Sequence, residues 1–258
     1  MTHSPALGAP ATPVIVTGGA SGIGLASAEA LAAVGRPVAL WDINADAAQA
    51  AAERIASHHG VAAIGVAADL RLPDAIAPAL AATRAAVGAP GALVHAAGMV
   101  DTASLDGLTV ESWDSGMAIH LRSFALITQA IQADLAAQPG SAIVAIASIN
   151  ATLGNAMNPI YTAAKGGMLA LVRSLADRLA RDGIRVNSVS PGQILTPMMQ
   201  PAVDALPQGF FEKRILLERL GDPMEVGRVV RFLLSNEASY ITASEIVVDG
   251  GNISSQRG

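Results

Sequence analysis

The sequence predicts an α/β protein: one doubly wound parallel sheet of about seven strands, with helices on both faces. Short apolar segments alternate with longer amphipathic segments along the chain, as they do in repeated strand–helix–strand units. The apolar segments are continuous rather than alternating, which is typical of strands buried on both faces. Because no repeat or linker divides the 258 residues, we expect a single domain.

The strands and helices follow one another in regular order. Strands are expected at 14–18, 38–42, 62–69, 92–98, 142–148, 185–191 and 245–250. Helices are expected near 22–34, 45–58, 73–87, 111–137, 159–182 and 223–235. Pro73 and Pro223 suit first helical turns. Gly60 and Gly183 stand where helices should end.

Two segments lie outside this pattern. Residues 1–12 lack the basic and apolar regions of a signal peptide, and we expect them to form a flexible tail before the domain at 13–258. The segment 193–222 carries three prolines, two adjacent Met and two adjacent Phe. We expect it to add a small, mobile helical flap to the sheet core, with an ordinary packed helix pair as the alternative.

Composition excludes several functional classes. Hydrophobic residues make up 52% of the chain and charged residues 14%, but Gly, Pro, Ser, Thr or Asn interrupts every long charge-free stretch. No stretch gives the roughly 20 near-continuous apolar residues of a spanning helix, so no membrane association is expected. The absence of Cys excludes thiolate metal sites, and no metal is expected. A net charge of −5 argues against a nucleic-acid partner.

The first chemical motif is VTGGASGIG at 16–24, which follows a strand and opens a helix. Its glycines, Gly18, Gly22 and Gly24, let the backbone approach a pyrophosphate, and the helix N-terminus supplies N–H donors. The arrangement is typical of a Rossmann-type dinucleotide site. A glycine-rich turn with only a structural role is the alternative.

Asp42 ends the second expected strand, 18 residues after Gly24. A carboxylate at this point accepts hydrogen bonds from the adenosine ribose diol and repels a 2′-phosphate. No basic residue stands beside it, since Ile43 follows and Ser21 lies inside the glycine turn. The pattern favours NAD(H) over NADP(H), and an exposed turn aspartate is the alternative.

A candidate acid–base group follows the fifth strand. Tyr161 and Lys165 are four residues apart and share one helix face, and Ser148 ends the strand before them. A nearby ammonium group stabilises a phenolate, so we expect the pKa of Tyr161 to fall below its ordinary value of about 10. We expect the Ser148 hydroxyl to bind the substrate oxygen.

From Pro13 to about Asn252 the chain resembles the short-chain dehydrogenase/reductase family. The resemblance rests on TGGASGIG, Asp42, Asp69, the set of Ser148, Tyr161 and Lys165, SPGQILTP at 190–197, and VVDGG at 247–251. It implies that Tyr161 is the general acid/base, that Lys165 binds the nicotinamide ribose, and that Ser148 orients the substrate. It also implies hydride transfer with a nicotinamide cofactor, a cytoplasmic protein and a homotetramer.

The resemblance also implies a set of cofactor-binding residues. These surround the phosphates, the adenine and the nicotinamide, in addition to Asp42, Ile43, Tyr161 and Lys165. They are Gly18, Ser21, Gly22, Ile23, Gly24, Asp69, Leu70, Ala97, Gly98, Pro191, Gly192, Ile194 and Thr196.

Two positions depart from the family pattern. Ala96 stands where an Asn is usual, before Ala97 and Gly98. Without the Asn side chain, the hydrogen bonds that brace the central strands are lost, so this difference is interpreted as structural. His120 replaces the Asn whose backbone carbonyl holds a water of the family's proton relay. Its imidazole either fills space, joins the relay as a titratable group, or marks an impaired enzyme.

The expected substrate pocket is mostly apolar. Its candidate residues are Ser148, Asn150, Met157, Gln193 and Met198, and no arginine is placed among them for an anion. We therefore expect an NAD-dependent alcohol dehydrogenase or carbonyl reductase acting on a neutral secondary alcohol or ketone. A polyol or sugar dehydrogenase is the alternative within the family, and a non-catalytic dinucleotide-binding protein is the alternative of another class.

Overall fold

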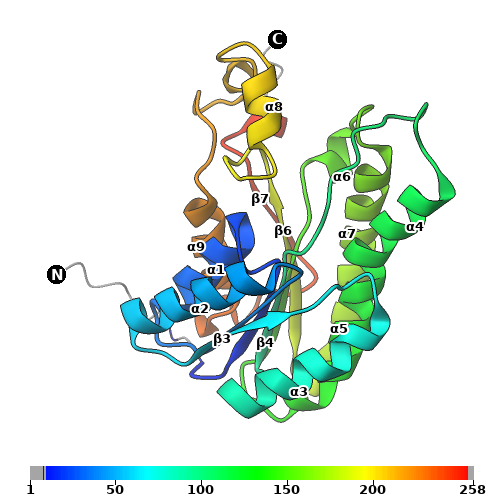
Figure 1. Cartoon of the computed structure of the whole chain (residues 1–258). Coiled ribbons are helices and arrows are strands. Elements are labelled where there is room, and N and C mark those ends of the chain that lie inside the picture. Colours follow the sequence, from blue (N-terminus) through cyan, green and yellow to red (C-terminus); the bar gives the residue numbers. More distant parts are fainter. Residues whose placement is uncertain (1–7, 9, 255–258) are drawn as a thin grey trace.

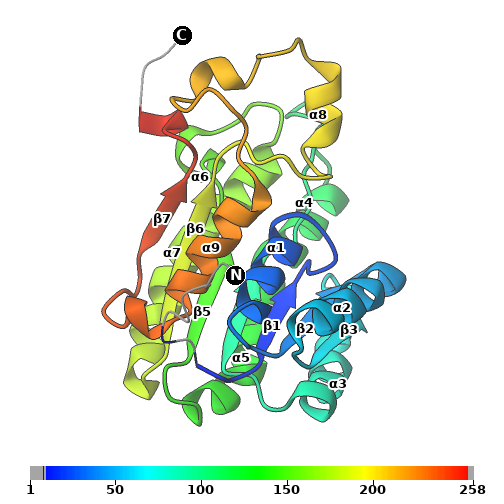
Figure 2. The ribbon, with the colours of Figure 1, turned by 90° about the vertical axis from the view of Figure 1, so that its left-hand side faces the viewer.

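A seven-stranded parallel sheet forms the centre of the protein, in a computed structural model that describes residue 8 and residues 10–254. Its strand order is β3-β2-β1-β4-β5-β6-β7 (Figures 1 and 2). The strands are β1 (Val14–Thr17), β2 (Val38–Asp42), β3 (Ala63–Ala67), β4 (Ala92–His95), β5 (Ala142–Ile146), β6 (Arg185–Pro191) and β7 (Glu245–Val248). The expected fold class and strand number are confirmed.

Helices cover both faces of this sheet (Figure 1). They are α1 (Gly22–Ala32), α2 (Ala45–His59), α3 (Ile76–Val87), α4 (Val110–Met117), α5 (Ser123–Ala136), α6 (Asn150–Leu153), α7 (Pro159–Leu179), α8 (Gln200–Ala205) and α9 (Pro223–Leu233). Leu31, Ile55 and Val230 pack α1, α2 and α9 on one face. Leu80 and Met168 belong to the core on the other face, where α3, α5 and α7 lie.

Local sequence explains where several helices begin and end. The Asp222 side chain accepts from the Met224 N–H, and the Glu225 side chain accepts from the Asp222 N–H. These two hydrogen bonds cap the start of α9 at Pro223. Asn44 accepts from the Ala47 N–H at the start of α2. That helix ends at Gly60, which adopts the left-handed conformation at φ 68°.

The single helix expected at 111–137 is interrupted. A π-helical turn over Ala118–Arg122 separates α4 from α5, and His120 lies within it. The buried hydroxyl of Ser123 bonds the Ile119 carbonyl within this region. Hydrophobic periodicity does not reveal one extra residue in a helix, and such π turns are frequent at functional sites.

The segment expected to form a flap contains α8 and a short 3-10 turn at Glu212–Arg214, and it rises beyond the carboxyl end of the sheet (Figure 2). Ile194 anchors its start through a bridge to Gly221 at its end. Of the expected N-terminal tail, residues 1–7 and 9 lie outside the described residues. Every helix within the described part of the chain is too short or too polar to span a bilayer.

The buried side chain of Arg36 connects the segment before β1 to the end of α9. Its side chain is 1% exposed. Nε donates to the Thr12 carbonyl at 2.9 Å, and the two terminal nitrogens donate to Thr12 Oγ1 at 2.9 Å and to the Leu234 carbonyl at 3.1 Å. The guanidinium therefore holds the chain entering β1 against the end of α9.

Replacing Arg36 with Met is expected to lower the free energy of unfolding by about 3 kcal/mol, because one buried and two partly buried acceptors lose their donor. The midpoint of thermal unfolding should fall by roughly 6–12 °C in a calorimetric scan. Arg54→Met is the matched control: Arg54 is exposed and lies 3.6 Å from Glu29, so its midpoint should stay near wild type. Equal midpoints for the two variants would contradict the role of Arg36.

Candidate active site

The candidate site lies at the carboxyl edge of the sheet, where the strand order reverses between β1 and β4. Ligands of open α/β sheets bind at such a switch point. A cleft of about 250 Å³ opens there. It is lined by Gly18, Ser21, Gly22, Ile23, Gly24, Asp42, Ala96, Ala97, Gly98, His120, Ile146, Tyr161, Lys165, Thr196, Pro197 and Met198. The structure thus brings most of the expected cofactor residues together.

The glycine turn after β1 has the shape that a phosphate-binding loop requires. Gly18 and Gly22 adopt positive φ angles of 63° and 53°, which side chains with a Cβ rarely adopt. A Cβ on Gly24 would lie 2.0 Å from the Gly18 carbonyl oxygen. Because that space must stay empty, the turn packs tightly and directs the start of α1 into the cleft. These residues fit a dinucleotide pyrophosphate.

Asp42 sits at the rim of the cleft, bound to the glycine turn. Its Oδ2 accepts from the Ala20 N–H at 3.1 Å, and its Oδ1 accepts from the Asn44 N–H at 3.0 Å. Two backbone donors hold the carboxylate in one orientation. Lys165 is the one Lys or Arg among the described residues that line this cleft, and it belongs to the opposite, Tyr161 end.

Tyr161 and Lys165 line one end of the cleft, and Ser148 joins them from outside its lining. The side chains of Ser148 and Tyr161 are hydrogen-bonded, and Ser148 Oγ also accepts from the Asn150 N–H at 3.1 Å. Lys165 is 4% exposed and donates from Nζ to the Ile146 carbonyl at 2.6 Å. Its Nζ lies 5.4 Å from the centroid of the Tyr161 ring. The sequence spacing therefore identified a real cluster.

The electrostatics of this cluster differ from the expectation. Burial raises the pKa of Tyr161 above its ordinary value, and the hydrogen bond from Ser148 offsets that rise only in part. Burial also lowers the pKa of Lys165 to about 7. The expected fall in the Tyr161 pKa was wrong, because burial disfavours the charged form of both groups.

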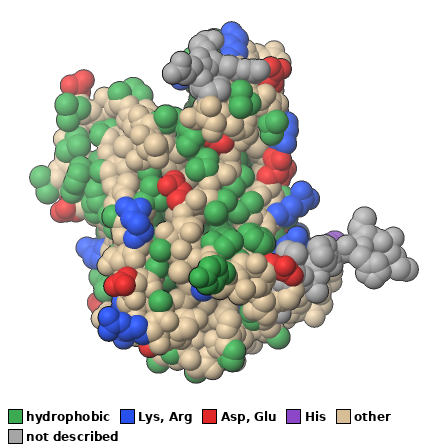
Figure 3. Space-filling model, turned by 180° about the vertical axis from the view of Figure 1, so that it is seen from behind, with side chains coloured by type: hydrophobic (Ala, Val, Ile, Leu, Met, Phe, Trp, Pro, Cys, Tyr) green, Lys and Arg blue, Asp and Glu red, His purple; other side chains and the backbone are tan. Residues whose placement is uncertain are grey.

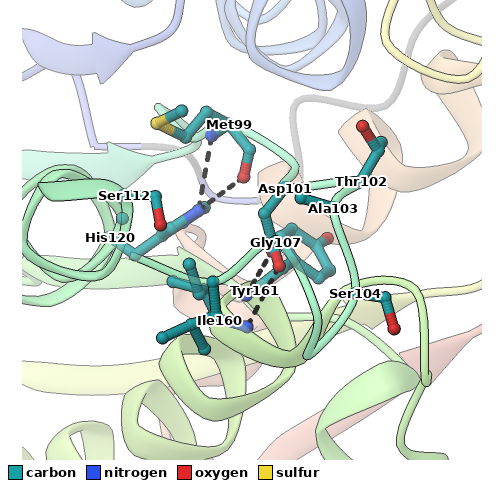
Figure 4. A pocket seen from close by; sticks show the side chains of 12 residues that line it. Met99, Asp101, Thr102, Ala103, Ser104, Gly107, Ser112, His120, Ile160 and Tyr161 are labelled. Carbon is teal, nitrogen blue, oxygen red and sulfur yellow. Dashed lines mark hydrogen bonds between the residues drawn. The ribbon is translucent and has the colours of Figure 1, made fainter. Parts of the chain in front are cut away.

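Asp101 has a role that the sequence did not reveal. It lies on the loop after β4, yet its carboxylate accepts from the backbone N–H of Tyr161 at 2.8 Å and of Ile160 at 3.3 Å (Figure 4). Asn158 donates to the Asp101 carbonyl, and Ser104 Oγ donates to the Ala156 carbonyl. The loop is thus attached to the first turn of α7. Sixty residues separate Asp101 from Tyr161, so no local pattern predicts the contact.

Two buried histidines lie at the cleft, and one of them, His120, lines it. His95 ends β4 and stacks on Phe124. His95 Nδ1 is 3.0 Å from Thr17 Oγ1, and Nε2 is 3.2 Å from the His120 carbonyl. His120 in turn contacts Met99 and stands edge-on to Tyr161, with ring centroids 5.5 Å apart. Burial lowers the pKa of each imidazole to about 3, so both rings are neutral near pH 7.

The remaining expected residues fall into two groups. Thr196 and Met198 line the cleft, and Thr196 packs against Gly22. Several others lie outside the lining of the cleft. Asp69 forms an ion pair with Arg71 at 2.7 Å, and Leu70 is buried in the core. The rest of this second group comprises Ile43, Pro191, Gly192, Ile194, Asn150, Met157 and Gln193, all absent from the cleft wall.

A second cavity of about 190 Å³ lies on the α4 side of Tyr161 (Figure 4). It is lined by Met99, Asp101, Thr102, Ala103, Ser104, Gly107, Leu108, Ser112, Gly116, His120, Ile160 and Tyr161. His120 and Tyr161 line both cavities and so separate them. Within the described residues, no three His, Asp or Glu side chains gather as metal ligands.

Fold and site together define a Rossmann-type protein with a dinucleotide cleft at the switch point of its sheet. A family model described as enoyl-(acyl carrier protein) reductase matches residues 18–252. The chain belongs to the short-chain dehydrogenase/reductase family and is an oxidoreductase.

Individual relatives cover nearly the whole chain. A probable galactose dehydrogenase of Rhizobium meliloti is 35% identical over 92% of this chain and 93% of its own length. A cyclopentanol dehydrogenase of Comamonas sp. is 36% identical over 92% of this chain and 95% of its own. L-sorbose reductase of Gluconobacter frateurii, solved with NADPH and L-sorbose, superposes with a TM-score of 0.90 at 27% identity, covering 96% and 99% of the two chains.

Asp101→Ala is expected to lower kcat about tenfold, because two N–H groups at the start of α7 lose their acceptor and Tyr161 loses its fixed position. Asp101→Asn keeps one acceptor oxygen and should recover most of the loss. Steady-state kinetics with the best available substrate checks both. Asp106→Ala, on the same loop but exposed, is the control. Equal kcat values for Asp101→Ala and Asp106→Ala would contradict this role.

Proposed function

We propose that the protein is an NAD(H)-dependent dehydrogenase that interconverts a neutral secondary alcohol and its ketone, with Tyr161 as the general acid/base. One observation carries the proposal. Tyr161 and the buried amine of Lys165 line the cleft that the glycine turn and Asp42 also border, and Ser148 is hydrogen-bonded to Tyr161. A proton-transfer group therefore faces a site shaped for a dinucleotide.

Different residues of the cleft fit different parts of the cofactor. The glycine turn fits the pyrophosphate, Asp42 fits the adenosine ribose diol, and Lys165 fits the second ribose. The nicotinamide, when bound, supplies the carbon that accepts or donates a hydride. NAD(H) is favoured because the Asp42 carboxylate repels a 2′-phosphate and the described cleft lining holds no basic side chain near it to offset that repulsion. L-sorbose reductase, a structural neighbour, was solved with NADPH, which makes this preference the point to test.

In the oxidation direction, the side chains around Tyr161 move one proton. Ser148 Oγ orients the substrate hydroxyl. The phenolate form of Tyr161 accepts the proton of that hydroxyl at Oη and becomes the neutral phenol. Lys165 has a pKa of about 7 and exchanges its own proton near neutrality. When protonated, its ammonium stabilises the phenolate form of Tyr161. Reduction of a ketone runs the same proton transfer in reverse.

The walls around Tyr161 support a neutral substrate. Among the described residues, the basic side chains are Lys165 in the cleft wall and the neutral His120 in the walls of both cavities. The wall of the α4-side cavity is otherwise largely apolar. A sugar or polyol substrate is the second candidate, because the probable galactose dehydrogenase and L-sorbose reductase are named for sugars. A panel holding cyclic alcohols, open-chain alcohols, polyols and sugars, assayed by NADH formation, separates the two.

The same panel tests whether the protein is an enzyme of this kind. Tight NADH binding without turnover of any compound would favour a non-catalytic dinucleotide-binding protein.

We also propose that the protein is cytoplasmic and forms a homotetramer. Exposed apolar side chains support the tetramer. Tyr240 is fully exposed, and Val247 is exposed on the edge strand β7. Hydrophobic groups reach the surface at several places in Figure 3. Light scattering that shows a stable monomer would overturn the tetramer.

Tyr161→Phe is expected to lower kcat by about 10²–10⁴-fold, the usual contribution of a positioned acid/base group. The NADH dissociation constant, followed by fluorescence, should change less than about twofold, because the ring remains. Tyr240→Phe is the matched control, since Tyr240 is the chain's other tyrosine and is fully exposed. Near-normal turnover by Tyr161→Phe would remove Tyr161 from the mechanism.

Asp42→Ser is expected to shift kcat/KM toward NADP⁺ relative to NAD⁺ by about tenfold or more, equivalent to about 1.4 kcal/mol. The cause is the loss of a carboxylate that repels the 2′-phosphate. Asp46→Ser removes an exposed carboxylate from the first turn of α2 and controls for net charge. An unchanged NAD⁺/NADP⁺ ratio in Asp42→Ser would show that Asp42 does not select the cofactor.

A further inference from the structure

His120 carries a buried acceptor atom that no residue in the described part of the chain satisfies. The side chain is 1% exposed, and Nδ1 has no hydrogen-bond partner. A buried polar atom without a partner is costly and calls for a physical explanation. The ring belongs to the walls of both the cofactor cleft and the α4-side cavity.

A hydrogen-bond chain fixes where the proton of His95 lies. Thr17 Oγ1 accepts from the N–H groups of Ala96 and Ala97, each at 3.1 Å, so its own proton is directed to His95 Nδ1 at 3.0 Å. His95 therefore carries its proton on Nε2 and donates it to the His120 carbonyl at 3.2 Å. That carbonyl already has a donor from within the protein.

The imidazole of His120 is held in the same way. Nε2 lies 2.8 Å from the Met99 carbonyl and 3.3 Å from the Met99 N–H, and the shorter contact places the ring proton on Nε2 (Figure 4). Nδ1 is then a bare acceptor. It lies over Gly98, where an added Cβ would be 2.9 Å from Nδ1 and 2.4 Å from Cε1. Gly98 thus makes room for this ring.

We propose that His120 Nδ1 is a ligand-binding group that accepts a hydrogen bond from a hydroxyl of the molecule bound in the cleft. The hydroxyl belongs either to the nicotinamide ribose of the dinucleotide or to the substrate. The proposal rests on the proposed function, because it takes the cleft to hold a hydroxyl-bearing ligand. Burial keeps the ring neutral, with a pKa of about 3, so Nδ1 remains an acceptor at working pH.

Three variants separate the two ring nitrogens. In His120→Asn the amide oxygen takes the place of the acceptor Nδ1, in His120→Gln the amide nitrogen takes the place of the donor Nε2, and in His120→Leu both polar atoms are lost. The probes are NADH, followed by fluorescence titration, and ADP, followed by calorimetry as a ligand that spans only the Asp42 and glycine-turn end. Thermal unfolding of each variant shows that it is folded.

A ribose donor predicts that Gln and Leu at position 120 weaken NADH binding about fivefold, that Asn does not, and that ADP binding is unchanged in all three. A substrate donor predicts equal NADH affinities, with the same ranking appearing in substrate KM or kcat. Two results would overturn the proposal: equal behaviour of all variants in both assays, or Gln behaving as wild type while Asn behaves as Leu. The NADH ranking does not need turnover, so it is independent of a failed substrate panel.

Discussion

Burial of the Lys165 amine at the end of β5 is the constraint on which the site depends. A primary amine that is 4% exposed must find a partner, and here it donates to the Ile146 carbonyl. That bond fixes the face of α7 that carries Tyr161. Close packing leaves α7 little freedom: a Cβ on Gly116 would lie 2.5 Å from Ile160, and one on Gly167 would lie 2.9 Å from Leu121. The Asp101 carboxylate holds the first turn of the same helix.

The two departures from the family pattern, Ala96 and His120, are connected in the folded protein through His95. His95 and His120 belong to one hydrogen-bond chain that runs from Thr17 on β1 to the loop at Met99. The π-helical turn brings the His120 carbonyl to His95 and the His120 ring to Gly98. Ala96 lacks a polar side chain to brace the central strands, and His95 bonds Thr17 in the adjacent strand instead. Considered separately, neither residue explains the arrangement.

The sequence predicted what depends on local pattern. Apolar runs located all seven strands, the glycine turn and Asp42 located the cofactor cleft, and the four-residue spacing of Tyr161 and Lys165 placed both on one helix face. It did not predict the π turn at His120 or the contact between Asp101 and Tyr161, because these depend on packing between distant segments. The direction of the Tyr161 pKa shift also depends on burial, which spacing alone does not reveal.

Titration of the Lys165 amine tests this account most directly, because its burial sets the electrostatics of the site. The chain has only two lysines, Lys165 and the exposed Lys213, so isotope labelling of lysine gives two resonances for NMR. Lys165→Arg identifies which is which. The account predicts that the Lys165 amine of the ligand-free protein loses its proton as the pH rises through about 7. A Lys165 resonance that stays fully protonated to pH 10 would contradict it.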